Sequence, residues 1–144
     1  MLTKLEEDLF EGVKSGKFFS LTQAAFIVSG VDSSQMLGVY MRKFYSIVAH
    51  LRGDVKGYDE VKARTIFDWL WKTKPRRYQL GGNFKLTQVV DAQLGETEKV
   101  GNCLGLTLLY NSLAQEFGLS MKATYLDNFL GYPHVFSILH AETV

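Results

Sequence analysis

One cysteine and one histidine in this 144-residue chain are placed where they could perform nucleophilic chemistry. Cys103 is the only cysteine, and it follows Asn102 where a polar loop gives way to a strongly apolar segment. We expect Asn102 to cap a helix there, because its side-chain oxygen can accept from the free amides of the first turn. A thiol at the N-terminus of a helix lies at the positive end of the helix dipole, which favours the thiolate, and the same amides can bind an oxyanion.

The alternative for Cys103 is a buried structural thiol, since free cysteines are among the most buried residues. His134 favours chemistry, because a catalytic cysteine takes its base from a histidine that is distant in sequence but adjacent in the fold. A helix with the cysteine, a strand, a turn and a strand with the histidine can bring the two side chains together. We therefore predict a catalytic pair of Cys103 and His134, with Asn102 as a candidate for the helix cap or the oxyanion site.

The segment after Cys103 predicts a central helix that ends near Gly118. Apolar residues occupy most sides of its first turns, which is typical of a helix buried on several faces. Gly118 offers a left-handed stop, and Leu119 can pack back onto the helix as a Schellman ending requires. Two alternating runs follow, 121–126 and 134–140, and we expect them to form a small antiparallel sheet.

The first two-thirds of the chain is predicted to be helical. Apolar residues recur there at helical spacing, and cap and stop signals divide the region into five helices. The expected ranges are 3–14 with an end near Gly16, then 20–28, 32–51, 58–74 and 86–95. The predicted fold is therefore α+β, one domain of residues 1–144 in which a helical layer (1–95) precedes a core of cysteine helix and strands (101–144).

Two stretches resemble a known family. Residues 101–119 read Gly-Asn-Cys-Leu-Gly-Leu-Thr-Leu-Leu-Tyr-Asn-Ser-Leu-Ala-Gln-Glu-Phe-Gly-Leu, and residues 133–136 read Pro-His-Val-Phe. They resemble the transglutaminase-like, papain-related superfamily, and within it the SirB1-type bacterial branch, which carries a similar Gly-Asn-Cys helix, helix end and histidine-led strand. The resemblance implies a cysteine-proteinase-like core behind a helical layer, with Cys103 as nucleophile and His134 as its base.

The chain departs from the family pattern in two places. Family members usually carry an Asp, Glu or Asn on a strand after the histidine strand, where it orients the imidazole. Only ten residues follow His134, so the candidates for this third residue are Asp127, Asn128 and Glu142. The usual Pro-Gly-His also reads Gly-Tyr-Pro-His in residues 131–134. We expect the chain to be truncated at its C-terminus, or the missing strands to be absent or supplied by another chain.

The other two histidines are expected to lie outside this site, and the basic turn at 75–78 is not expected to bind phosphate. His140 is six positions beyond His134 on the same strand, about 20 Å away. His50 lies near the end of a helix, where the helix dipole stabilises a histidine. Arg76 and Arg77 are expected to be solvated.

Four aromatic residues give further expectations. Trp69 and Trp71 are two positions apart and cannot share a helical face, so we expect one in the core and the other along a groove. Tyr78 and Tyr132 are candidates for gating a cleft, with packing in the core as the alternative.

Composition excludes several function classes. Sixteen basic and fifteen acidic residues give a net charge of +1, so there is no electrostatic case for nucleic acid or an anionic membrane. The acidic N-terminus does not resemble a signal peptide, and no apolar run approaches the roughly 20 residues that span a bilayer. A lone cysteine suits a reducing compartment, so we expect a cytoplasmic protein. One cysteine with scattered histidines is poor zinc spacing, and we expect neither a metal nor a cofactor.

The expected function is acyl transfer through a thioester, by a peptidase, amidase or transamidase with a protein or peptide substrate. The main alternative is a non-catalytic relative that keeps the fold as a binding or scaffold module, and a third is a redox-sensing cysteine. A two-stranded sheet is marginal by itself, so we also expect an exposed strand edge and a homodimer formed through it.

Overall fold

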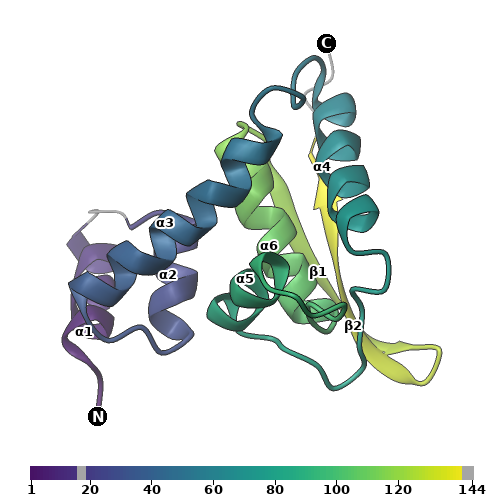
Figure 1. The fold of residues 1–144 in the computed structure, drawn as a ribbon. Coiled ribbons are helices and arrows are strands. Elements are labelled where there is room, and N and C mark those ends of the chain that lie inside the picture. Colours follow the sequence, from purple (N-terminus) through teal and green to yellow (C-terminus); the bar gives the residue numbers. More distant parts are fainter. Residues whose placement is uncertain (16–18, 141–144) are drawn as a thin grey trace.

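The computed structural model describes residues 1–15 and 19–140, which form six helices and one two-stranded sheet (Figure 1). The predicted α+β class and the predicted order of elements are confirmed, with ends that differ by up to three residues. The predicted helix end at Gly16 and the candidate Glu142 lie outside the described residues. In chain order the elements are α1 (Lys4–Ser15), α2 (Leu21–Val28), α3 (Ser34–Leu51), α4 (Asp59–Thr73), α5 (Leu86–Leu94), α6 (Cys103–Glu116), β1 (Met121–Phe129) and β2 (Tyr132–Leu139).

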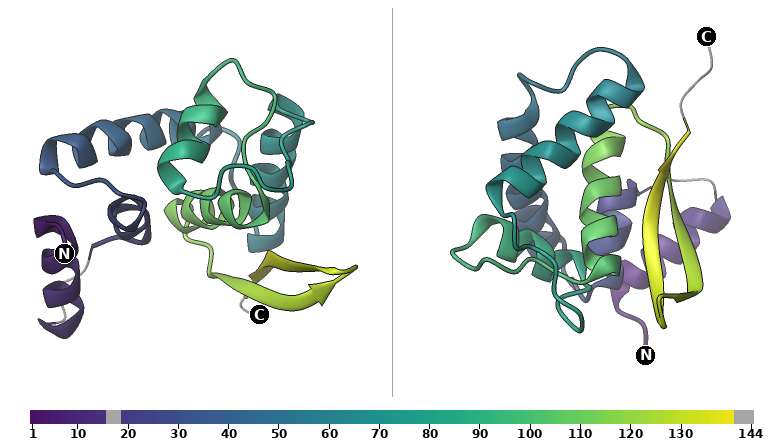
Figure 2. Two further views of the ribbon diagram at one scale, coloured as in Figure 1. Left: turned by 90° about the horizontal axis from the view of Figure 1, so that it is seen from below. Right: turned by 90° about the vertical axis from the view of Figure 1, so that its right-hand side faces the viewer.

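The helix α6 is the centre of the structure. It packs against α2, α4, α5 and both strands, and Figure 2 shows the hairpin on one side of α6 and α5 on the opposite side. This position explains why its sequence is apolar on most sides. The hydrophobic core is one cluster built mainly from α2, α3, α5 and α6, and its fully buried members include Phe26, Ile27, Phe44, Ile47, Leu51, Leu86, Val89, Leu109 and Leu113.

Both ends of α6 have the predicted local structure. The side-chain oxygen of Asn102 accepts from the Gly105 N–H at 3.0 Å, so Asn102 is the cap of the helix. At the other end Gly118 has a φ of +78°. The amides of Gly118 and Leu119 donate back to carbonyls of the last turn at 3.0 Å each, which is the Schellman ending.

The first two helices lie at one end of the molecule, and α3 connects them to the rest (Figure 1). The first turn of α1 is closed by a capping box, because the Glu6 amide donates to Thr3 Oγ1 at 3.2 Å and the Thr3 amide donates to Glu6 Oε2 at 2.8 Å. Among the described residues, no helix is both long and apolar enough to cross a membrane.

The two strands form an antiparallel hairpin in which Leu126 faces His134. The His140 amide donates to the Ser120 carbonyl at 2.9 Å. Along an antiparallel pair, residues whose backbone groups bond the partner strand alternate with residues whose groups point away. Because residue 140 bonds toward the first strand, the even-numbered residues of β2 are the ones whose backbone groups point toward β1. The backbone N–H and C=O groups that point toward the other edge of β2 belong to Val135, Ser137 and Leu139.

Pro133 agrees with this register. A proline has no N–H to donate, so within a sheet it is tolerated where that group would point away from the neighbouring strand. Residue 133 is an odd-numbered position of β2, at which the N–H points toward the edge not paired with β1. The described chain provides no strand for that edge, as the sequence predicted.

The expectation that both arginines of the 75–78 turn are solvated is wrong for Arg77. Its side chain is buried at 2% exposure, with Nη1 donating to the Leu70 carbonyl at 2.6 Å and Nη2 donating to Gln93 Oε1 at 2.8 Å. Burial lowers the pKa of Arg77 to about 10, so the guanidinium stays charged at neutral pH. The turn sequence gave no signal of this role, because neither acceptor is near Arg77 in the chain.

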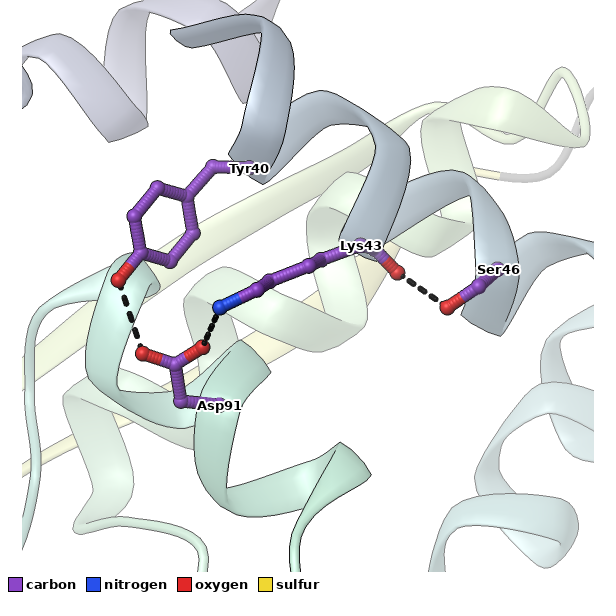
Figure 3. Close-up of polar contacts among 4 residues, drawn as sticks. All are labelled: Tyr40, Lys43, Ser46 and Asp91. Atoms are coloured by element: carbon purple, nitrogen blue, oxygen red, sulfur yellow. Dashed lines mark hydrogen bonds and ion pairs between the residues drawn. The ribbon is translucent and has the colours of Figure 1, made fainter. Parts of the chain in front are cut away.

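A second polar cluster joins α3 to α5 at the surface (Figure 3). The Asp91 carboxylate accepts from the Tyr40 hydroxyl and from Lys43 Nζ, each at 2.8 Å, and Nζ lies 4.8 Å from the centre of the Tyr40 ring. Partial burial and the bond to Asp91 raise the pKa of Tyr40, so its phenol keeps its proton at neutral pH. The cluster links α3 to α5 through Lys43 and Asp91, which are 48 residues apart in the sequence.

Replacing Asp91 by alanine is expected to lower the free energy of unfolding by about 1 kcal/mol, because a partly exposed ion pair and one hydrogen bond are lost together. Urea denaturation measures this change. The loss should shrink in 1 M salt, where charges are screened. Asp68→Ala is the matched control at an exposed position of α4. An equal loss in both variants, or a loss that does not depend on salt, would contradict the role of the cluster.

Candidate active site

A groove of about 560 Å³ lies between α4, α6 and β2. Both predicted catalytic residues border it, Cys103 from the first turn of α6 and His134 from β2. The rest of the lining is mostly apolar. Its other members are Phe67, Leu70 and Trp71 of α4, Arg77 and Tyr78, Leu106, Thr107 and Tyr110 of α6, Met121 of β1, and Val135, Phe136, Ser137 and Leu139 of β2.

Two side-chain hydrogen bonds hold β2 against α6. Thr107 Oγ1 donates to the Val135 carbonyl at 3.3 Å, and Ser137 Oγ donates to Asn111 Oδ1 at 2.5 Å. We call these two bonds the α6–β2 seam. The seam fixes which residues of the strand lie beside which turns of the helix.

The seam also places the two candidate catalytic residues relative to each other. From one bond of the seam to the next, the helix advances by four residues, about 6.0 Å, and the strand advances by two residues, about 6.6 Å. The helix and strand run in the same direction, since 107 and 111 meet 135 and 137 in that order. One step back from Thr107 and Val135 therefore brings Cys103 to the level of residues 133–134.

Cys103 borders the groove, is partly exposed and is not sealed in the core. It is the first residue of α6. The Gly105 amide is occupied by the cap, and the Leu106 amide donates to the Asn102 carbonyl. The described hydrogen bonds give the amides of Cys103 and Leu104 no acceptor, so two N–H donors lie next to the thiol.

The chain that leads into Cys103 is held by two neighbouring segments. On one side the Arg77 carbonyl accepts from the Val100 amide at 2.8 Å, and Tyr78 forms a parallel bridge with Gly101. On the other side the Asn83 carbonyl accepts from the Asn102 amide at 2.9 Å. The start of α6 is therefore a supported position, as a catalytic thiol requires.

His134 also borders the groove and is partly exposed. Its ring stacks on Phe136, with ring centres 6.2 Å apart. Alternation along β2 places His134 and Phe136 on one face of the sheet, and Ser137, which bonds α6, on the other face. Cys103, from the first turn of α6, and His134, from β2, both border this groove.

Asp127 and Asn128, the two described candidates for a third catalytic residue, do not border the groove. Asp127 and Asn128 are exposed in β1, and Asn128 Oδ1 accepts from the Gly131 amide at 2.9 Å within the hairpin turn. Glu142 is not among the described residues. Of the described residues that border the groove, none is acidic.

The remaining histidines and tryptophans lie where the sequence predicted. His140 is exposed beyond the end of β2, and His50 stacks on Trp69 at 6.0 Å between ring centres. Trp69 packs on the core and Trp71 borders the groove. The part of the chain that the structure describes contains no cluster of three or more His, Cys, Asp or Glu that could hold a metal ion.

Several groove residues were not predicted from the sequence. Thr107 and Asn111 follow Cys103 at intervals of four, and this polar stripe on an apolar helix was a signal that could have located the seam. Phe67 and Tyr110 read as core positions of two helices. Of the two tyrosines considered as gates, Tyr78 borders the groove and the 57% exposed Tyr132 does not.

The fold and the groove define an α+β domain that presents one thiol and one imidazole on a shared, mostly apolar surface. No protein family, curated protein or solved structure matches the chain. The transglutaminase-like resemblance therefore stays a prediction from the residues.

Proposed function

We propose that this protein is a cysteine-dependent acyl-transfer enzyme with a transglutaminase-like core, which uses Cys103 as nucleophile and His134 as general acid and base. One observation carries the proposal: the two residues border the same groove, at the same level of the α6–β2 seam. The supported first turn of α6 and its two unoccupied amides add to it. The lone thiol is also suited to the cytoplasm.

In the proposed reaction the Cys103 thiolate attacks the carbonyl carbon of an amide. The C–N bond breaks, the amine leaves with a proton from His134, and a thioester remains on the sulfur. Water or a second amine then gives a proton to His134, attacks the thioester and releases the thiolate. The amides of Cys103 and Leu104 are placed to stabilise the oxyanion of each step. Hydrolysis and transamidation share this chemistry.

A non-catalytic binding or scaffold module is the second candidate function. One observation favours it: the described residues that border the groove are mostly apolar, and none of them is acidic. A mostly apolar groove suits the binding of a ligand without catalysis.

Alkylation of Cys103 separates the two functions. At pH 6.5 iodoacetamide is expected to modify the native protein at least about tenfold faster than the same protein unfolded in urea, because in the proposed pair His134 takes the proton of the thiol as the sulfur attacks, and the unfolded chain holds no base beside the thiol. The unfolded chain is the internal reference, since Cys103 is the only thiol. The rate is measured by mass spectrometry, and His134→Ala should bring the native rate to or below that of the unfolded chain.

His50→Ala and His140→Ala are the matched controls, because both histidines lie outside the groove. Neither should slow the reaction. A native rate below that of the unfolded chain, or a rate that His134→Ala leaves unchanged, would reject the catalytic pair and favour the binding module.

A further inference from the structure

The wall that β2 gives to the groove is a sheet edge with unused hydrogen-bonding groups. Six backbone groups point to this edge, the N–H and C=O groups of Val135, Ser137 and Leu139. In the described hydrogen bonds only the Val135 carbonyl has a partner, Thr107. All three residues border the groove. A row of alternating donors and acceptors of this kind is complementary to the backbone of another extended chain.

The other walls of the groove suit the side chains of such a chain. Phe67 and Trp71 of α4 and Tyr110 of α6 form an apolar surface that faces the edge. An added strand lies about 4.8 Å from its neighbour and directs its side chains above and below the sheet.

The charge of the groove favours a neutral or acidic occupant. Its buried cation is Arg77, whose guanidinium donates to two neutral oxygens. Among the described residues Arg77 has no carboxylate partner, and no acidic residue borders the groove. A positive charge in an apolar surrounding is weakly screened, so it disfavours a basic segment and attracts an acidic one.

We infer that the groove binds its substrate as an extended, apolar and neutral or acidic peptide segment, which adds a third strand to the edge of β2. This inference names the substrate class and rests on the proposed acyl-transfer function. An antiparallel added strand is the more stable arrangement. Cys103 and His134 lie at the N-terminal end of β2, so the residues on the N-terminal side of the reacting carbonyl occupy the groove.

Backbone methylation of the peptide tests this inference without requiring catalysis. The protein carries Cys103→Ala, so binding is measured in the absence of acyl transfer. The probes are fluorescein-labelled hexapeptide pools that alternate Leu, Val or Phe with Ser or Asp, and fluorescence anisotropy gives the Kd. In an added strand only every second backbone N–H points toward β2. N-methylation of these amides should weaken binding at least about tenfold per site, the value of one ladder hydrogen bond, whereas methylation of the alternate amides should weaken it less than about threefold.

Two comparisons complete the test. Val135→Pro removes a donor from the outer edge and keeps the ladder to β1, so it should weaken binding at least about tenfold, whereas Val135→Ala should bind within about threefold of the parent. Pools with Lys in place of Asp should bind more weakly. Circular dichroism shows whether each variant folds, and the methylation scan uses an unaltered β2.

Three results would overturn the inference. Methylation could weaken binding equally at both sets of amides, Lys pools could bind as tightly as Asp pools, or sedimentation could show a dimer that Val135→Pro dissociates. The last result would make a second copy the occupant of the edge. Because no thiol is present in these assays, they can fail while the alkylation test succeeds, and the reverse also holds.

Discussion

Replacing Gly105 by alanine is expected to destabilise the protein by roughly 3 kcal/mol, although alanine is the better helix former. A Cβ at Gly105 would overlap the Asn83 carbonyl oxygen and lie 2.7 Å from Val89 Cγ1. Both atoms are held, one in the loop that supports Asn102 and the other in the core. The helix can accept the side chain only if that loop moves. Urea denaturation should show the loss, together with a fall of about 10 °C in Tm.

Gly38→Ala is the matched control, because Gly38 also lies within a helix. Its added Cβ would meet only Arg42 Nη1, at an ordinary 3.5 Å. The variant should therefore gain up to about 1 kcal/mol from the lower flexibility of the unfolded chain. If Gly105→Ala were as stable as the parent, or if both variants shifted in the same direction, the close approach of the Asn83 loop to α6 would be wrong.

Replacing Arg77 by methionine is expected to lower the free energy of unfolding by about 3 kcal/mol, although burying the charge is itself costly. The loss of the guanidinium leaves Gln93 Oε1 buried without its donor. The Leu70 carbonyl suffers less, because it also accepts from the Lys74 amide and from Thr73 Oγ1. Urea denaturation measures the effect.

Two further variants separate a specific network from a general loss of charge. Arg76→Met removes an exposed arginine next in sequence and should change stability by less than about 0.5 kcal/mol. Adding Gln93→Met to Arg77→Met removes the orphaned amide and should restore at least about 1 kcal/mol. An additive double variant, or an equal effect at Arg76, would show that Arg77 does not stabilise the protein by bonding Leu70 of α4 and Gln93 of α5.

The fold was largely predictable because its signals are local. The Asn102 cap and the Gly118 stop are satisfied by bonds within three to five residues, so the sequence defined both ends of α6. The hairpin was predictable for the same reason. The burial of Arg77 was not, because its acceptors Leu70 and Gln93 are brought to it by the packing of two helices.

The sequence named the two candidate residues that border the groove, but it revealed less of the surroundings of these residues. The lone thiol at a capped helix and the histidine of the last strand identified Cys103 and His134 before any packing was known. The opposite wall depends on how α4 packs beside α6, which periodicity does not reveal. Phe67 and Trp71 therefore read only as apolar residues of a helix, and their part in the groove came from the structure.

The α6–β2 seam joins two repeats that are not commensurate. At each step the strand advances about 0.6 Å farther than the helix. After five steps the mismatch approaches 3 Å, which is nearly the rise of one strand residue. Matched anchors of this type can therefore extend over only a few turns. A longer hairpin would drift out of phase with the helix, which agrees with the way the hairpin tip projects past α6 in Figure 1. Lengthening the strands would thus extend the tip without extending the attachment.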